Sequence, residues 1–452
     1  MITITDMFCG AGGSSTGAVA AGATVRLAMN HWKRAIETHN TNHPNTDHAL
    51  ADISQADPRY YPRTNILIAS PECTNHSLAK GKQRKQQNQL DLWGSRWATK
   101  SDPAEERSRC TMWDPLRFAE CHKYEMIILE NVVDARYWTM WSAWLQAWDC
   151  LGYDHELVFL NSMFAHPTPQ SRDRMYFVAW KRGQRKPDLN IRPAADCPKC
   201  GPVESVQAWK NPVKRAGKYR QQYVYVCPGC TREITPRYYP AASAIDWTRP
   251  MQRIFERAKP LKEKTLARIA DGLEKFSRDP FLMGLNHQRT QVNPVNAPCP
   301  TQTTYDDTAL VTPPFLIDHI AEYRPRAIDH PMSTIVGGGN HQSLVIPPAW
   351  LMSYYNNGAF ESVGDPIPTV TTLERHALVT ATSEKPRVED CGFRMLEPHE
   401  IQAAMAFPRD YVVIGTRREK VKQLGNAVTP PVMQLLMRRC IASLESGAQN
   451  EH

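Results

Sequence analysis

A glycine-rich turn near the N-terminus constrains the fold of this chain more than any other feature. Residues Ile2–Thr5 alternate in the manner of a β-strand, and the segment Asp6–Gly17 follows them with four glycines. A strand, a glycine-rich turn and a helix in succession allow a nucleotide-like ligand to approach the backbone at the helix N-terminus. The turn therefore predicts an α/β fold with a doubly wound, Rossmann-like sheet. A nicotinamide oxidoreductase also fits such a pattern.

Polar residues at the ends of further predicted strands extend this expectation. Residues Val25–Met29 are strand-like and end at Asn30 and Trp32, and a third such position is Asp52 with Ile53. Successive strand ends of a doubly wound sheet are where the ribose and base of a nucleotide cofactor are held. The alternative interpretation is ordinary turn chemistry.

A cysteine follows the next predicted strand. The apolar run Ile66–Ala69 is typical of a buried strand, and Cys73 lies just beyond it on a proline-containing turn. Reactive groups of α/β enzymes are placed at such strand ends, although most cysteines are small buried hydrophobic residues. The polar, basic segment Lys80–Gln89 predicts a long loop that could close over a phosphate backbone; a plain solvated loop is the alternative.

A carboxylate and two arginines form the other candidate catalytic group. Glu130 follows the predicted strand Tyr124–Leu129 and is a candidate general acid, or else a helix cap or salt-bridge partner. Arg172 and Arg174 precede the predicted strand Met175–Trp180. Because they alternate along an extended chain, both are expected on one face, where two guanidinium groups suit a planar acceptor or a carboxylate.

Length and composition indicate a globular, intracellular protein. A chain of 452 residues has room for about two or three domains, and 42% hydrophobic with 22% charged residues is ordinary for a soluble fold. We expect no transmembrane helix, because no run of 18 apolar residues exists, and no signal peptide at Met1–Asp6. Twelve cysteines in such a protein predict thiols or metal ligands rather than disulfides.

The positive charge is concentrated in one block. The chain carries +8, and residues Lys181–Pro240 hold 13 Lys and Arg against 4 Asp and Glu, a local +9 that leaves −1 for the rest. A basic block beside a near-neutral body indicates a polyanionic partner, with a solvated basic surface as the alternative.

Two Cys-x-x-Cys pairs lie inside this block. Cys197 and Cys200 are separated by 26 residues from Cys227 and Cys230. This spacing predicts a tetrahedral structural zinc site; four unrelated surface thiols are the alternative. Because the basic excess covers the same segment, we expect a zinc ribbon that binds phosphates.

A threefold repeat follows the cysteine pairs. A Pro-x-x-Thr motif begins at Pro298, Pro331 and Pro366, with spacings of 33 and 35 residues, and a Leu-Val pair follows each proline by 12 or 13 residues. The repeat predicts short β units joined by polar loops. Between the cysteines and the repeat, the apolar spacing over Met251–Lys275 predicts packed amphipathic helices.

Taken in order, these motifs resemble those of the DNA (cytosine-5)-methyltransferases, which use S-adenosylmethionine. The glycine-rich turn is similar to the cofactor loop of that family, the Cys73 turn to its nucleophile loop, and Glu130 to its Glu-Asn-Val motif. Residues 170–174 match Gln-x-Arg-x-Arg, and residues 394–408 and 423–431 resemble the ninth and tenth motifs. The resemblance covers roughly residues 1–180 and 390–440.

The resemblance implies a division of the chain and a set of site residues. A catalytic core would span residues 1–180, and residues 391–452 would complete it. Residues 181–390 would form an inserted, mainly β target-recognition region, with the zinc ribbon at 195–235 and the β repeats at 296–381. The implied cofactor contacts are Phe8, Gly10, Gly12, Gly13, Asn30, Trp32, Asp52, Ile53, Asn426 and Val428, and the implied catalytic residues are Cys73, Glu130, Arg172 and Arg174.

The implied reaction is transfer of a methyl group to carbon 5 of cytosine in double-stranded DNA, through a covalent Cys73 adduct on a flipped base. Glu130 would act near ring N3, and the arginines would hold the base oxygen. Three departures stand out: Glu72 and Thr74 flank Cys73 where the family has Pro and Gln, Asn30 replaces a ribose-binding Glu, and Trp32 occupies a position where the family often has Asp.

These departures leave two alternatives, an enzyme that transfers another group and a catalytically silent DNA-binding protein. The resemblance further implies a monomer in the cytoplasm of a prokaryote or a phage-infected host, with no membrane partner and with a cognate restriction enzyme as a candidate partner.

Overall fold

The computed structural model describes residues 1–71, 111–239, 241–244, 246, 252–261, 263, 266 and 397–448, and the backbone of short strands between 281 and 395. Cys73, its neighbours Glu72 and Thr74, and the basic loop at 80–89 lie outside the described residues. The chain divides into two compact units. One comprises Met1–Tyr239, Thr369–Leu373 and Ile401–His452, and the other Pro240–Pro368 and Glu374–Glu400.

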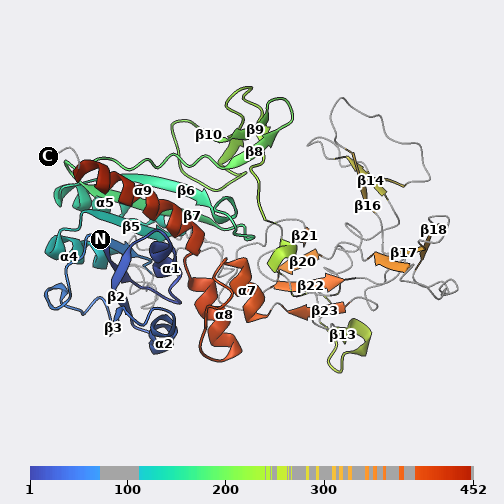
Figure 1. Cartoon of the computed structure of the whole chain (residues 1–452), viewed down its shortest axis with the longest axis horizontal. Coiled ribbons are helices and arrows are strands. Elements are labelled where there is room, and N and C mark those ends of the chain that lie inside the picture. The colour runs from blue at the N-terminus through green and yellow to red at the C-terminus, as the bar shows by residue number, and fades with distance from the viewer. Residues whose placement is uncertain are drawn as a thin grey trace, which may run out of the picture. The chain divides into compact units, whose positions relative to one another are not determined.

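The first unit is built on a seven-stranded sheet with the strand order β3-β2-β1-β4-β5-β7-β6 (Figure 1). Its strands are β1 Thr3–Met7, β2 Thr24–Asn30, β3 Asp47–Leu50, β4 Ile66–Ala69, β5 Met126–Asn131, β6 Tyr153–Asn161 and β7 Asp173–Lys181. The first five run parallel, and β7 is antiparallel to both of its neighbours. The strand order reverses between β1 and β4, as in a doubly wound sheet, so the predicted α/β class is confirmed.

Helices cover both faces of this sheet. Because its central strands are buried on both sides, their sequences are continuous apolar runs. Every residue of β4 and β5 is buried. One face packs against α1 (Gly13–Ala20) and α9 (Pro430–Ala448), and the other against α4 (Asp114–His122) and α5 (Trp141–Cys150). The helices α2 (Lys33–Asn42), α7 (Pro398–Ala404) and α8 (Arg417–Asn426) complete the described set. No described helix is long and apolar enough to cross a membrane.

The cysteine-rich segment forms small hairpins. Strands β8 (Ala194–Cys197) and β9 (Gly201–Glu204) pair as one hairpin. Strands β10 (Val206–Trp209), β11 (Tyr223–Val226) and β12 (Glu233–Ile234) form a three-stranded antiparallel sheet. Each Cys-x-x-Cys pair therefore lies at the turn between two strands.

The second unit contains a structural repeat that matches the sequence repeat. Three successive three-stranded sheets have the same topology, with the first strand of each in the centre. They comprise β14 (Phe281–Gly284), β15 (Val292–Pro294) and β16 (Thr308–Val311); β17 (Phe315–Asp318), β18 (Arg324–Ala327) and β19 (Gln342–Val345); and β20 (Trp350–Ser353), β21 (Phe360–Ser362) and β22 (His376–Thr380).

The pairing register of the repeat is also the same in all three units. The leucine of each Leu-Val pair lies opposite a leucine of the central strand: Leu310 opposite Leu282, Leu344 opposite Leu316 and Leu378 opposite Leu351. The third sheet is extended by β23 (Gly392–Met395) and β13 (Gln252–Arg253). The predicted β units are thus confirmed.

The helix predicted to begin at Met251 is wrong at its start. Residues 252–253 pair with β23, and Ile254–Glu256 form a single 3-10 turn. Backbone groups that bond to a neighbouring strand cannot also form a helix, and Pro260 cannot donate to one. Tertiary pairing overrides the helical spacing here.

The contact between α1 and α9 requires a glycine. A Cβ atom at Gly17 would lie 2.3 Å from the carbonyl oxygen of Pro430 and 2.8 Å from the Cβ of Met433. We predict that Gly17→Ala lowers the free energy of unfolding by about 1–3 kcal/mol, because the added methyl group forces the two helices apart. Urea unfolding measures this change. The matched change Val19→Ala, on the exposed side of α1, should have little effect, and an unaltered midpoint in Gly17→Ala would contradict the packing described.

Candidate active site

Backbone hydrogen bonds gather the loops that follow four parallel strands at one edge of the sheet. Cys9 N donates to Met29 O at 3.1 Å, which joins the loop after β1 to the end of β2. Ala51 N donates to Asn30 O at 3.1 Å, and Ser70 N donates to Met7 O at 3.2 Å. The segments after β1, β2, β3 and β4 therefore lie side by side, as expected at the switch point of such a sheet.

The glycine-rich turn needs glycine for two different reasons. Gly10 has a φ of 53°, and among the described residues a Cβ there would meet only the carbonyl oxygen of Phe8, at 3.9 Å. Gly13 instead allows close packing, because its Cβ would lie 2.0 Å from the carbonyl oxygen of Val428. The turn thus has a positive φ at Gly10 and receives the C-terminal segment at Gly13.

A buried polar network supports the first turn of α1. Ser14 Oγ and Ser15 Oγ donate to Asp6 Oδ2 at 2.5 and 2.7 Å. Ser15 Oγ also lies 2.9 Å from His39 Nε2, and His39 Nδ1 lies 2.8 Å from His48 Nε2. Asp6 Oδ1 has no partner in the described structure, and burial raises the pKa of Asp6 to about 6.

Two further side chains reach the turn from outside this network. His43 Nε2 lies 3.2 Å from Thr16 Oγ1. The Tyr411 hydroxyl donates to the carbonyl oxygen of Ala11. Burial lowers the pKa of His39 well below its usual value and lowers the pKa of His43 to about 4. Neutral imidazoles are therefore the state compatible with this packing.

The residues predicted to hold a ribose and base lie at the next two strand ends. Asn30 is buried, and its Oδ1 accepts from Trp32 N at 2.9 Å. Lys422 Nζ lies 4.5 Å from the centre of the Trp32 ring, so a cation covers one face of the indole. Asp52 is exposed and accepts from the backbone of the following turn, while Ile53 is buried.

Glu130 and Arg174 form an ion pair at the end of the buried strand β5. Arg174 Nε lies 2.8 Å from Glu130 Oε1, and the two side chains are only 12% and 10% exposed. Arg174 Nη1 also donates to its neighbour's carbonyl, Asp173 O, at 2.8 Å. An ion pair this short between two largely buried side chains restricts the orientation of the carboxylate.

Arg172 has different partners from Arg174. Its Nη1 donates to Gly425 O at 3.2 Å and its Nη2 to Ala427 O at 3.3 Å. These carbonyls flank Asn426, whose side chain is exposed. The sequence predicted both arginines on one face. Arg174 binds a carboxylate, and Arg172 binds a backbone segment.

The start of the Cys73 loop is tied to the Glu130 strand. Asn131 Nδ2 lies 3.4 Å from Pro71 O, two residues before the cysteine. Pro71, the last described residue before Cys73, therefore lies beside the end of the strand that carries Glu130. Asn131 belongs to the Glu-Asn-Val motif, but sequence reasoning gave it no role.

The four paired cysteines come together. The sulfur atoms of Cys197, Cys200, Cys227 and Cys230 all lie within 4.8 Å of one another. Cys197 Sγ and Cys230 Sγ are 3.5 Å apart. A tetrahedral zinc with bonds of about 2.3 Å places its sulfur ligands about 3.8 Å apart, so the arrangement fits this ion. Within the described residues, no other group of His, Cys, Asp or Glu side chains shares this arrangement.

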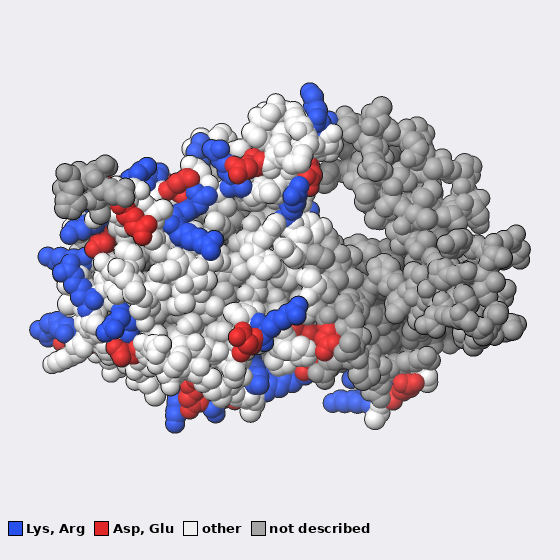
Figure 2. Space-filling model, viewed as in Figure 1, with Lys and Arg blue, Asp and Glu red and all other residues white. Residues whose placement is uncertain are grey.

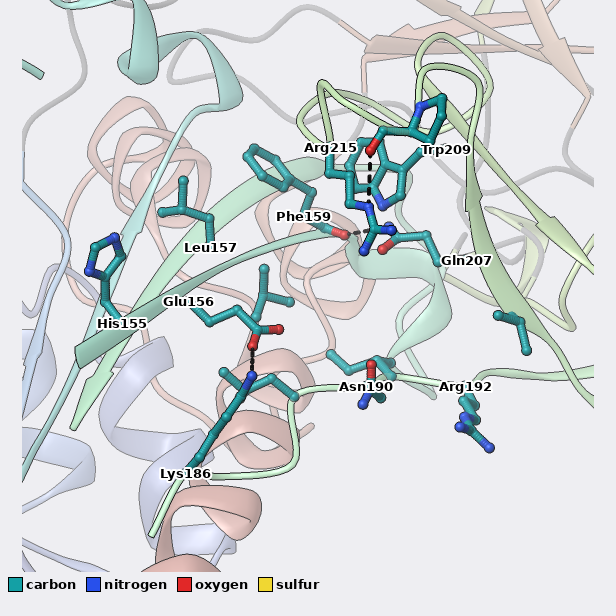
Figure 3. A pocket seen from close by; sticks show the side chains of 15 residues that line it. His155, Glu156, Leu157, Phe159, Lys186, Asn190, Arg192, Gln207, Trp209 and Arg215 are labelled. Carbon is teal, nitrogen blue, oxygen red and sulfur yellow. Dashed lines mark hydrogen bonds and ion pairs between the residues drawn. The ribbon is translucent and has the colours of Figure 1, made fainter. Parts of the chain in front are cut away.

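A cavity of about 750 Å³ lies elsewhere, between β6, the segment 186–192 and β10 (Figure 3). Two polar contacts close its sides: Lys186 Nζ pairs with Glu156 Oε2 at 2.6 Å, and Gln207 Nε2 donates to Phe159 O at 3.0 Å. None of the predicted site residues lines it. The candidate active site is therefore the strand edge with Glu130 and not this cavity.

The fold and this edge define an enzyme core that binds a nucleotide-like cofactor next to a buried carboxylate. The family model described as C-5 cytosine-specific DNA methylase matches residues 2–214 and 318–442. The chain therefore belongs to the C-5 cytosine-specific DNA methylase family, whose members methylate cytosine in DNA with S-adenosylmethionine.

Individual relatives agree with this assignment. An orphan methyltransferase of Bacillus phage SPbeta is 22% identical over 439 residues, covering 87% of this chain and 86% of the relative. A putative type II methyltransferase of Bacillus subtilis has the same identity and coverage. Among solved structures, the S. pombe Dnmt2 methyltransferase is 14% identical with a TM-score of 0.51, covering 99% of both chains. A DNMT2 variant of Spodoptera frugiperda, 13% identical, has a TM-score of 0.50 and covers 98% of this chain and 100% of that one. These two structures show the same fold.

The histidine cluster under the turn predicts how stability depends on pH. His43 has a pKa of about 4 when folded and an ordinary value of 6.5, so the unfolded chain binds more protons between these values. Stability should therefore fall as the pH drops from about 6.5 to 4. His43→Gln should reduce this fall by on the order of 2 kcal/mol, because glutamine does not titrate.

Chemical unfolding at several pH values measures the difference. Asp6, whose raised pKa acts in the opposite direction between 3.8 and about 6, is present in both proteins and cancels. His31→Gln, at an exposed position, is the matched control. Parallel curves for wild type and His43→Gln would contradict the prediction.

Proposed function

We propose that this enzyme methylates carbon 5 of cytosine through a covalent adduct with Cys73, formed on a base that has been flipped out of the duplex. The observation that carries the proposal is the tie between Asn131 and Pro71. It joins Pro71, two residues before Cys73 in the sequence, to the residue that follows Glu130, whose carboxylate is paired with Arg174. A thiol and an oriented carboxyl group at one strand edge are the two groups that addition to a cytosine ring requires.

The residues at the strand edge fit the cofactor of the family. The turn at Gly10 and the N-terminus of α1 suit the polar part of S-adenosylmethionine, and the segments of Asn30 with Trp32 and of Asp52 with Ile53 would contact its ribose and adenine. The exposed Asn426 and the segment with Val428 border the same turn. When bound, the cofactor supplies an electrophilic methyl group on a sulfonium sulfur.

The chain's own groups would then act on the base in a balanced sequence. The Cys73 thiolate forms a bond to carbon 6, and the ring electrons make carbon 5 nucleophilic enough to accept the methyl group. Transfer of the methyl group would leave the cofactor as a neutral thioether. Loss of the carbon 5 proton to water, return of the N3 proton to Glu130 and breakage of the bond between carbon 6 and sulfur would then restore the aromatic ring and the thiolate. Glu130 would donate a proton at ring N3, and Arg174 would keep that carboxyl group in position.

Arg172 would act through the backbone that it holds rather than on the base. Its bonds to the carbonyl groups of Gly425 and Ala427 support the segment that borders the cofactor loop. Removal of Arg172 should therefore affect cofactor binding as well as the rate.

DNA would be bound by two parts of the chain. Lys214, Arg215 and Arg220 are exposed and available for phosphate contacts, and the three β repeats would form the target-recognition region within residues 181–390. The catalytically silent DNA-binding protein and the transfer of another group are the alternatives that Glu72 and Asn30 suggest. A cognate restriction enzyme, a monomeric state and a cytoplasmic location stay predictions.

The central test is the substitution Cys73→Ser. We expect it to reduce formation of 5-methylcytosine by at least about a thousandfold while binding of DNA and S-adenosylmethionine is retained, because only the covalent step is lost. Nucleoside analysis of DNA after incubation measures the product. Cys121→Ser, an exposed cysteine, should remain active. Continued methylation by Cys73→Ser would exclude the assignment.

We propose that the four clustered cysteines hold one structural zinc ion per chain. Replacement of Cys227 by serine should remove the ion and lower the melting temperature, because metal binding and folding of small zinc modules are coupled. Elemental analysis and thermal unfolding measure both effects. Cys150→Ser, outside the cluster, is the control, and purified wild-type protein without zinc would reject the site.

A further inference from the structure

The cysteine-rich segment packs against β6 and the turn that follows it, next to the strand β7 that carries Arg174. Phe164, which follows β6, makes edge-to-face contacts with Tyr219 and Tyr225, with ring centres 4.9 and 5.0 Å apart. Trp209 packs in the same way on Phe159 at 5.7 Å. These aromatic residues belong to the hydrophobic core that β5 and β7 share with α9. The segment is therefore part of the catalytic unit and not a separate appendage.

Two polar contacts cross this junction. Lys218 Nζ lies 3.0 Å from Asp134 Oδ2, and the two side chains are only 26% and 22% exposed. Tyr219 N donates to Asp173 Oδ1 at 2.9 Å. Adjacent residues of one turn thus bind two different carboxylates of the catalytic core.

Both carboxylates adjoin the proposed catalytic residues. Asp134 lies in the short 3-10 helix Val133–Tyr137 that directly follows the Glu-Asn-Val motif. Asp173 is the first residue of β7 and precedes Arg174, which also donates to its carbonyl oxygen. A shift of either aspartate would therefore move the backbone that presents Glu130 or Arg174.

The same turn leads directly to the cysteines. Gln222 N donates to Lys218 O at 2.9 Å and Arg220 N to Tyr223 O at 2.7 Å, which closes the turn. Strand β11 begins at Tyr223 and ends immediately before Cys227. The cluster of thiols and the two polar contacts are thus at opposite ends of one short strand.

Several of the basic residues in this block form ion pairs within the protein itself. Arg182 pairs with Asp149 and Lys186 with Glu156, both at 2.6 Å, and Lys218 pairs with Asp134 at 3.0 Å. On the face shown in Figure 2, basic and acidic side chains are interspersed over the described surface. The basic excess of the sequence is therefore not by itself a measure of phosphate binding.

We propose that the cysteine-held segment is a brace for the catalytic site, and that Lys218 and Asp173 are positioning residues for Arg174 and Glu130. The proposal rests on the proposed function, which gives this pair its role. A displacement of about 1 Å in an acting group can cost about a hundredfold in rate, so a brace of this kind acts on catalysis without touching substrate. The brace assigns Lys218 to the protein interior and not to DNA.

The experiment compares Lys218→Met with wild type in the full-length, zinc-loaded enzyme. We expect kcat to fall about tenfold, whereas the KM for S-adenosylmethionine, the DNA affinity and its salt dependence stay unchanged. Lys181→Met is the matched control, because this exposed lysine lies at the far end of the same catalytic strand β7 and should leave every parameter unchanged.

A charge exchange provides the second variant. Lys218→Asp and Asp134→Lys should each lower kcat, and the two together should restore it to within about threefold of wild type, because the ion pair is re-formed with reversed polarity. Melting temperature and zinc content are measured for each protein. A double variant that regains stability and zinc but not kcat would overturn the brace.

A different result for Lys218→Met would also overturn it. An unchanged kcat, with weaker DNA binding and a salt dependence reduced by about one counterion, would identify Lys218 as a phosphate contact. Failure of the proposed function is recognised separately, by wild-type enzyme that forms no 5-methylcytosine or by an active Cys73→Ser protein.

Discussion

The close packing of the C-terminal segment on the glycine-rich turn is the constraint on which the site depends. The carbonyl oxygen of Val428 occupies the place where a side chain at Gly13 would lie, and that of Pro430 does the same at Gly17. Arg172 then holds the backbone of this segment by two hydrogen bonds. The first turn and the C-terminal segment of the chain therefore pack together at the site, although they lie about 400 residues apart in the sequence.

Buried polar groups around this contact form hydrogen bonds and ion pairs with one another and not with water. Asp6 accepts from two serines below the turn, and Glu130 is held by Arg174 beside it. The basic block, which sequence reasoning associates with a polyanion, also supplies cations to carboxylates of the core. Part of the positive charge in this enzyme thus serves the cohesion of the catalytic unit.

The sequence predicted the parts of the fold that depend on local pattern. The run Ile66–Ala69 is a strand within the same limits, and each Leu-Val pair of the repeat lies in a strand. β6 was not identified, because this edge strand mixes polar and apolar residues over Tyr153–Asn161 and gives no clear alternation. The prediction of a helix from Met251 is wrong at its start, because residues 252–253 pair with β23, a strand that is distant in the sequence.

For the site, too, sequence reasoning found the residues that belong to a local motif and missed the contacts between distant parts of the chain. Glu130 and the cysteine pairs belong to recognisable motifs. The partners of Arg172 lie some 250 residues away in the sequence, and no local pattern predicts them. The covalent step is the central claim, and DNA containing 5-fluorocytosine tests it most directly, because fluorine at carbon 5 prevents the proton loss that releases the enzyme. The account predicts a stable one-to-one protein–DNA complex in which the modified peptide contains Cys73. Methylation of ordinary DNA without any such complex, or an adduct at another residue, would contradict it.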